Sequence, residues 1–234
     1  MFINWLKKEY IMTKSKNNLS YNIFQWGKDI NFHYKFSELN KNDIKNGVNC
    51  FKLDGGTLDT YVSNIELLLE KKTDIILIGF SGAVSNRNGK QAPFFSGVKI
   101  ANKLGCPLIS ISDPTLSLDA DISLSWYAGN NQYLNIAQDI NNLLEKISDI
   151  TGARLLLFGG SGGGFSVLVQ ALLAKKDYDY FVWNCQTSIS QYSKKFVLDY
   201  LNKAFSINID QDTTNEEIYE FLEKKRVIHY LTKY

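Results

Sequence analysis

The chain has 234 residues, of which 44% are hydrophobic and 21% are charged, and its 26 basic residues nearly balance its 24 acidic ones. This composition is typical of one globular domain with a sizeable core, and the near-neutral charge argues against nucleic acid as a partner. No apolar run approaches the ~20 residues that a membrane-spanning helix needs, so we expect no membrane span.

The N-terminal residues are predicted to form a ragged extension over 1–19, followed by one domain over 20–234. Met12 is an alternative start of the chain within this extension. The segment lacks both the apolar stretch and the small-residue cleavage site of a secretory signal. The chain has three widely spaced cysteines and no CxxC pair, which argues against a disulfide framework and a zinc site. We therefore expect a cytoplasmic protein with no bound metal.

The first part of the domain is predicted to contain three strands and one helix. Residues 20–26 and 29–36 are two expected strands around a glycine turn, and 47–53 is a third, shorter one. Apolar residues recur at helical spacing over 57–71, where Thr57 is a suitable N-cap, so this segment is predicted to be a helix.

Apolar runs alternate with helical patterns over the rest of the chain. The runs indicate parallel strands buried on both faces, over residues 74–80, 107–112, 153–158, 178–185 and 226–232. Helical periodicity predicts helices over residues 95–104, 131–150, 163–175, 193–204 and 213–225. This alternation predicts an α/β fold with a mainly parallel central sheet.

The strongest local signal is a glycine-rich turn over residues 159–164, between an expected strand and an expected helix. Its glycines do not fit the spacing of a dinucleotide-binding fingerprint, and no lysine follows for a phosphate-binding P-loop. The turn does match G-x-S-x-G, the nucleophile elbow, in the required strand–turn–helix setting, with Ser161 as the nucleophile. A plain glycine turn with Ser161 as an ordinary helix cap is the alternative.

The chemistry of an elbow explains these residue types. Gly159 and Gly163 remove side chains that would clash with the neighbouring strand and helix, and Ser161 is then held above the carboxyl edge of the sheet. The backbone N–H of Gly162 points to where an oxyanion would develop. The loop after residues 74–80 begins with small residues, so Ser81 or Gly82 is the expected second oxyanion donor.

When the N-terminal pair is counted as the first two strands and the short segment 47–53 is left out, Ser161 follows the fifth strand, as in the α/β-hydrolase plan. Several further segments ahead of the elbow resemble a bacterial α/β-hydrolase-like family of capsular polysaccharide biosynthesis proteins, which includes sugar O-acetyltransferases. These segments are FSGAV (80–84), PFFSG (93–97), ISDPTL (111–116) and SWYAG (125–129). The resemblance implies a three-layer α/β-hydrolase-like sandwich, an acyl-Ser161 intermediate, acetyl-coenzyme A as donor and a carbohydrate acceptor.

Three residues in these segments have two interpretations each. Asp113 ends an expected strand at the edge where α/β ligands bind, but Asp113–Pro114 is also a simple turn that stops the strand. Trp126 and Tyr127 have side chains suited to stacking on a sugar ring, but they are equally typical of a core aromatic pair.

A nucleophilic serine needs a base, and the chain has only two histidines. His33 lies in an expected N-terminal strand, out of triad order. His229 follows Asp210 and Asp212 in the order that a triad requires, but it falls inside the expected strand 226–232. We therefore expect the last strand and helix of the fold to be absent, as in a truncated, split or degraded member; His229 as the base is the alternative.

Two functions follow from these expectations. The first is serine-dependent acyl transfer or ester hydrolysis, most specifically O-acetylation of a capsular or surface polysaccharide. The second is a non-catalytic or truncated partner subunit in polysaccharide biosynthesis or secretion. Either form is expected to have weak activity alone and to self-associate or pair with a complementing C-terminal chain, because an apolar sheet edge would be uncovered.

Overall fold

The computed structural model describes residues 20–34, 36–87 and 89–231. The expected N-terminal extension, residues 1–19 with Met12, lies outside the described residues.

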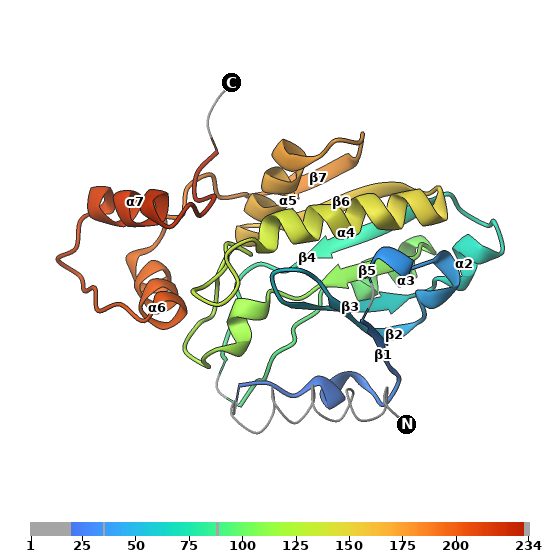
Figure 1. Ribbon diagram of the computed structural model, residues 1–234, viewed down its shortest axis with the longest axis horizontal. Helices are drawn as coiled ribbons and strands as arrows, with labels where there is room; N and C mark the ends of the chain where they lie inside the picture. The colour runs from blue at the N-terminus through green and yellow to red at the C-terminus, as the bar shows by residue number, and fades with distance from the viewer. Residues whose placement is uncertain (1–19, 35, 88, 232–234) are drawn as a thin grey trace.

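A seven-stranded sheet forms the centre of the molecule (Figure 1). Its strands are β1 (Ile30–His33), β2 (Gly47–Lys52), β3 (Thr57–Ser63), β4 (Ile75–Phe80), β5 (Leu108–Ile111), β6 (Arg154–Gly160) and β7 (Asp179–Trp183). The order across the sheet is β1-β2-β3-β5-β4-β6-β7. Only β3 runs against its neighbours, and the other pairs of adjacent strands are parallel. The prediction of an α/β fold with a mainly parallel sheet is confirmed.

Six α-helices are described, with short 3₁₀ turns between other elements. The helices are α2 (Glu66–Leu69), α3 (Val98–Leu104), α4 (Ile136–Thr151), α5 (Gly162–Leu173), α6 (Lys194–Phe205) and α7 (Asn215–Lys224). Among the described residues no helix is both long and apolar enough to cross a bilayer.

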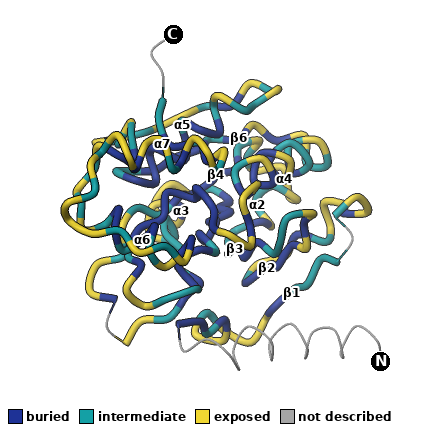
Figure 2. The backbone as a smooth tube through the Cα atoms, turned by 60° about the vertical axis from the view of Figure 1, so that its left-hand side comes forward, coloured by how far each residue is buried: buried dark blue, intermediate teal, exposed yellow. Residues whose placement is uncertain are grey.

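The helices are divided between the two faces of the sheet. Apolar residues of α4, such as Ile140 and Leu144, pack with Leu155 and Leu157 of β6 in the main core, and α5 packs on the same side. Helix α3 packs on the opposite face through Ala101, against β4 and β5. Helices α6 and α7 lie at one end of the molecule and share a second core with α5 (Figures 1 and 2). The strands of the sheet are mostly buried in Figure 2, and exposure is concentrated on helices and loops.

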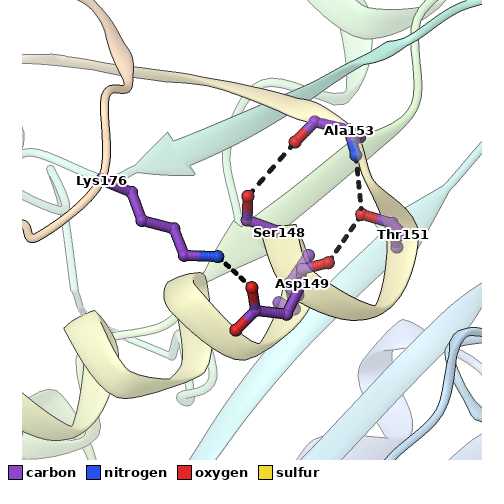
Figure 3. Close-up of polar contacts among 6 residues, drawn as sticks. Ser148, Asp149, Thr151, Ala153 and Lys176 are labelled. Carbon is purple, nitrogen blue, oxygen red and sulfur yellow. Dashed lines mark hydrogen bonds and ion pairs between the residues drawn. The ribbon is translucent and has the colours of Figure 1, made fainter.

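The turn from α4 into β6 explains how the strand that leads to the elbow begins. Gly152 ends α4 in the left-handed conformation, at φ 67°. The Thr151 hydroxyl donates to the carbonyl of Ile147 at 2.6 Å and accepts from the N–H of Ala153 at 3.2 Å. An ion pair between Asp149 and Lys176 ties the same end of α4 to the segment before β7 (Figure 3). These local contacts end the helix and direct the chain into the sheet.

The helix predicted over 57–71 is wrong. Residues 57–63 form β3, which pairs antiparallel with β2 through the tight turn at Asp54–Gly56, and only Glu66–Leu69 is helical. Leu58 and Val62 are four residues apart, a spacing that lies on one face of a helix and also on one face of a strand. Pairing with β2 and β5 makes this segment a strand.

Three other strand predictions need correction. Residues 23–26 form a 3₁₀ helix capped by the Asn22 side chain, so the expected N-terminal hairpin does not exist. Ser161 follows the sixth strand in chain order, because Gly47–Lys52 and Thr57–Ser63 are both strands of the sheet. Strand β7 is not buried on both faces, because it pairs only with β6 and no described helix covers its outer side. Of the strand predicted over 226–232, the described residues 226–231 pair only through an isolated bridge between Ser188 and Tyr230, and they are not a strand of the sheet.

Candidate active site

Ser161 occupies a sharp turn between β6 and α5. Its backbone has φ 53° and ψ −123°, a conformation that residues other than glycine rarely adopt. The Ser161 N–H donates to the carbonyl of Trp183 at 3.2 Å, which ties the turn to the end of β7. The Ser161 side chain makes no capping bond to α5, so the interpretation as an ordinary helix cap is wrong. The strain is that of a serine presented at the carboxyl edge of the sheet.

The glycines around Ser161 are required by close backbone approach. A Cβ on Gly159 would lie 2.6 Å from the carbonyl carbon of Gly163. A Cβ on Gly163 would lie 2.6 Å from the carbonyl oxygen of Phe80, at the end of β4. Real Cβ atoms do not approach backbone atoms this closely, and the backbone cannot move aside without disturbing the sheet. Both glycines are therefore required by close backbone approach at this turn.

Ser161 lines a cavity of about 380 Å³ at the carboxyl ends of β4 and β6. The chain leaves β4 toward β5 on one side and leaves β6 toward β7 on the other. Such a reversal in strand order opens a crevice at the sheet edge, which is where α/β proteins bind ligands. Besides Ser161, the cavity is lined by Phe80, Gly82, Ala83, Ser96, Gly97, Ile100, Phe158, Gly160, Trp183 and Asn184.

The three candidate oxyanion donors differ in what they contact. The Ser81 N–H already donates to the hydroxyl of Tyr127 at 2.9 Å, so Ser81 does not present a free donor. Gly82 lines the cavity, and a Cβ at Gly82 would lie 3.7 Å from the Cβ of Ser161. Gly162 is the first residue of α5, where backbone N–H groups have no acceptor within the helix. Of the two alternatives for the second donor, the contacts favour Gly82 over Ser81.

The side chain that contacts the Ser161 hydroxyl is Gln186, which the sequence interpretation missed. Gln186 donates from Nε2 to Ser161 Oγ at 2.8 Å, and its Oε1 accepts from the indole N–H of Trp126. An indole N–H can only donate, so it fixes the amide oxygen toward Trp126 and the NH₂ toward Ser161. An amide has no basic nitrogen at neutral pH. Gln186 therefore orients Ser161 but does not take its proton.

His229 is buried away from these contacts. Its Nε2 lies 3.0 Å from Glu223 Oε1 on α7, and its Nδ1 is buried without a partner among the described residues. Burial lowers the pKa of His229, and Glu223 opposes this shift. Within the described part of the chain, the Ser161 hydroxyl contacts no histidine or carboxylate. The structure thus does not bring His229 to Ser161.

The remaining candidate acids and His33 have structural partners. Asp210 accepts from the N–H groups of Asp212 and Thr213 in the loop between α6 and α7, and these residues are outside the His229 contacts. His33 bonds to Asn49 Oδ1 at 2.9 Å and stacks on Phe51, and burial lowers its pKa.

Asp113 and the two aromatic residues shape the loop beside the elbow. The Asp113 carboxylate accepts from the Ser125 hydroxyl at 2.7 Å and from the Tyr127 N–H at 2.6 Å, and burial raises its pKa. Trp126 and Tyr127 are buried, and both have left-handed backbones at φ 53°. Asp113 is thus a structural anchor, and the core interpretation of the aromatic pair is the correct one.

A larger cavity with a mixed polar and apolar lining, of about 650 Å³, meets the Ser161 cavity at Ala83. Its lining includes Ser85, Asn86, Asp121, Ser123, Lys195 and Asp199. The loop that forms one wall is fixed by Arg87, which is buried and donates to the carbonyls of Leu116 and Ile122.

Comparison with known proteins gives structural similarities only. No family model matches the chain, and no curated protein matches its sequence. Two structures of the capsule O-acetyltransferase of Neisseria meningitidis serogroup A are similar, with 19% and 18% identity, a TM-score of 0.49 each and 81% of this chain covered. They are covered over 71% and 72% of their own length. A histidine-to-alanine mutant of that enzyme in complex with CoA is similar with 17% identity and a TM-score of 0.47, covering 76% of this chain and 67% of its own. We therefore infer the role of each residue only from the contacts that it makes in this chain.

Proposed function

We propose that the chain is an α/β-hydrolase-like protein that carries out serine-dependent acyl transfer or ester hydrolysis at Ser161. The strained backbone of Ser161, at φ 53° and ψ −123° beside a cavity at the sheet edge, is the observation that carries this proposal. Strain of this kind persists only where the surroundings enforce it, and here Gly159 and Gly163 permit the enforcing contacts.

The reaction proceeds through an acyl-serine. Ser161 Oγ forms a bond to the acyl carbonyl carbon as its hydroxyl proton passes to a base, and the carbonyl oxygen becomes an oxyanion facing the N–H groups of Gly162 and Gly82. The C–S or C–O bond to the leaving group then breaks, and the leaving group takes up a proton. A hydroxyl of the acceptor, or water, repeats the sequence on the acyl-serine and releases Ser161. Each oxyanion donor contributes ~3 kcal/mol to stabilisation of the transition state.

The sequence resemblance suggests the two substrates. Acetyl-coenzyme A is the first acyl donor to test, and a capsular or surface polysaccharide is the acceptor class. The larger cavity that meets the Ser161 cavity at Ala83 suits a carbohydrate, since its mixed lining offers carboxylate, amide and hydroxyl groups for sugar hydroxyls beside apolar groups such as Phe196. We assign the acceptor to this cavity.

A non-catalytic partner subunit is the second candidate, and one observation favours it. Ser161 Oγ has Gln186 as its side-chain partner, at the position where an active serine has its base. Removing the base from a triad removes most of its contribution, on the order of 10⁶ in kcat in a well-studied protease, and the oxyanion hole with binding leaves ~10³–10⁴ over water. We therefore expect slow turnover unless another chain supplies the base.

A fluorophosphonate probe and acetyl transfer from acetyl-coenzyme A test the two candidates together. The wild-type chain and Ser161→Ala are compared, with Ser190→Ala as the control for loss of a buried serine elsewhere. Labelling and slow turnover that Ser161→Ala abolishes and Ser190→Ala retains support the enzyme. If the wild-type chain is labelled no more than Ser161→Ala, the enzymatic proposal is contradicted and the non-catalytic partner subunit becomes the supported function.

A further inference from the structure

An apolar trough adjoins the Ser161 cavity. Its volume is about 380 Å³, and its lining is entirely hydrophobic: Leu77, Ile100, Leu104, Leu156, Phe158, Phe181 and Trp183. Three of these residues, Ile100, Phe158 and Trp183, also line the Ser161 cavity. The two cavities therefore share walls, and the trough begins at the nucleophile.

The trough follows one face of the sheet. The strand register places Gly160 beside Trp183, then Phe158 beside Phe181, then Leu77 beside Leu156, and the side chains of the five non-glycine residues lie on the face opposite α4 and α5. Helix α3 supplies the other wall through Ile100 and Leu104. Beyond Leu156 the same face carries Arg154, whose ion pair with Asp179 at 2.7 Å ends the apolar strip.

Large apolar side chains are exposed along this trough. Phe181 is 60% exposed, Leu104 59% and Trp183 46%. Phe158 forms the floor, and its ring lies where side chains on Gly79 and Gly97 would be: a Cβ on Gly97 would come within 2.5 Å of Phe158 Cζ. A contiguous apolar surface beside a reactive serine is typical of a binding site for an apolar group.

We propose that this trough binds the hydrocarbon chain of the acyl donor, so that the donor carries an acyl group longer than acetyl. The inference rests on the proposed function, because the carbonyl end of the chain must lie at Ser161. The distance from Gly160 to Leu156 along β6 is four residues, about 13 Å at the rise of a strand, so an extended chain of roughly eleven carbons spans it and an octanoyl chain fills most of it. A chain in the trough buries its methylenes against Phe158, Phe181 and Trp183.

Chain-length preference is the first test. The kcat/KM values for p-nitrophenyl acetate, butyrate, hexanoate and octanoate are measured, below their micelle concentrations, for the wild-type chain and for Leu104→Glu. Leu172→Glu is the matched control, because Leu172 is an apolar residue of α5 that is 53% exposed and lies outside the trough. We expect octanoate to exceed acetate by at least tenfold in wild type and in Leu172→Glu, and Leu104→Glu to lose that preference.

Binding without chemistry is the second test. 2-Bromo-octanoic acid, which carries its bromine next to the carboxyl group and therefore at the Trp183 end of the trough, is titrated into Ser161→Ala while tryptophan fluorescence is recorded. Bromine quenches nearby indoles, so we expect saturable quenching that a Trp183→Phe change in the same background removes. Sedimentation of wild type, Leu104→Glu and Leu172→Glu is recorded alongside.

The outcomes separate this inference from the proposed function. Quenching through Trp183 with no ester turnover supports the acyl-chain site and contradicts the enzymatic proposal. Serine-dependent turnover with equal rates for acetate and octanoate, and no quenching, overturns the acyl-chain site alone. A wild-type dimer that only Leu104→Glu dissociates, with no chain-length preference, also overturns it and assigns the trough to a second copy. Absence of both turnover and quenching overturns both.

Discussion

The two faces of the sheet at β6 and β7 differ in how they are covered. On the face toward α4 and α5, Leu155 and Leu157 of β6 are 1% and 0% exposed. On the opposite face, Phe158 of β6 lies beside Phe181 of β7, and the Phe181 side chain is 60% exposed. The first face holds the elbow in place and tolerates little change, whereas the second offers an apolar surface that a ligand or a partner can cover.

Two glycines beside Ser161 also differ in this way, because one contacts the covered face and the other contacts the open face. Gly163 faces the Phe80 carbonyl oxygen within the sheet, and Gly160 faces the ring of Trp183 on the open side, where a Cβ would lie 2.4 Å from Trp183 Cε2. A backbone carbonyl in a paired strand cannot move away, but a half-exposed ring can rotate outward. The same steric overlap should therefore lower the free energy of unfolding more at Gly163, on the covered face, than at Gly160, on the open face.

Gly163→Ala should have the largest effect. The added methyl group overlaps the Phe80 carbonyl at 2.6 Å, and relief requires β4 and α5 to separate. We expect the free energy of unfolding to fall by about 3 kcal/mol or more, at the upper end for overpacking. Urea unfolding measures this loss.

Gly152→Ala is the control for that substitution. Gly152 has φ 67° with open space around its Cβ position, so only conformational strain applies and the loss should be about 1–2 kcal/mol. Equal losses for Gly152→Ala and Gly163→Ala would contradict the steric argument.

Gln186→Ala should have the next largest effect. Gln186 bonds to both Ser161 Oγ and the Trp126 indole, and its loss leaves the buried indole N–H unsatisfied. We expect a loss of about 1–3 kcal/mol in the free energy of unfolding. Gln138→Ala, which removes an exposed glutamine bonded to Asn142, should change it by less than 0.5 kcal/mol, as is usual for surface substitutions. Similar losses from both variants would show that the Gln186 bridge does not stabilise the elbow.

Gly160→Ala should cost less than about 1 kcal/mol, because the Trp183 ring can swing away from the new methyl group. The same movement should change the tryptophan fluorescence of the chain, since Trp183 leaves its contact with Phe181. A loss comparable to that of Gly163→Ala would show that the open face is as rigid as the covered one.

The sequence predicted the central part of the fold well, and for a physical reason. The runs over 74–80, 107–112 and 153–158 are apolar because β4, β5 and β6 have both faces packed in hydrophobic cores. G-x-S-x-G identifies a turn whose glycines are sterically required. The prediction failed where tertiary contacts decide. The spacing in 57–63 fits a helix as well as a strand, and the apolar run in β7 predicts burial that no described helix provides.

The partner of Ser161 could not be found in the sequence. Gln186 belongs to no catalytic motif, and only the turn after β7 brings it to the elbow, where its own N–H also donates to the Ser161 carbonyl at 3.3 Å. His229 is the residue that triad order selects, but pairing of residues 229 and 231 with 187–189 directs its imidazole toward Glu223.

His229→Gln gives the smallest expected effect, on the pH dependence of stability. Burial lowers the pKa of His229 in the folded chain below its unfolded value of about 6.5, so the unfolded chain binds more protons in this range. Stability contributed by the neutral imidazole is therefore present above pH 6.5 and is lost as the pH falls toward 5. The urea midpoint of wild type should fall more between pH 7 and pH 5 than that of His229→Gln. His33, whose pKa is also lowered, is present in both chains and cancels in the difference.

The same variant separates a structural histidine from a catalytic one. Because Nε2 of His229 faces Glu223, we expect fluorophosphonate labelling of Ser161 to be equal in wild type and His229→Gln at pH 8, where the imidazole is neutral. Loss of labelling in a variant that remains folded would make His229 the base, and residues 226–231 would then have to leave their pairing with residues 187–189 to reach Ser161.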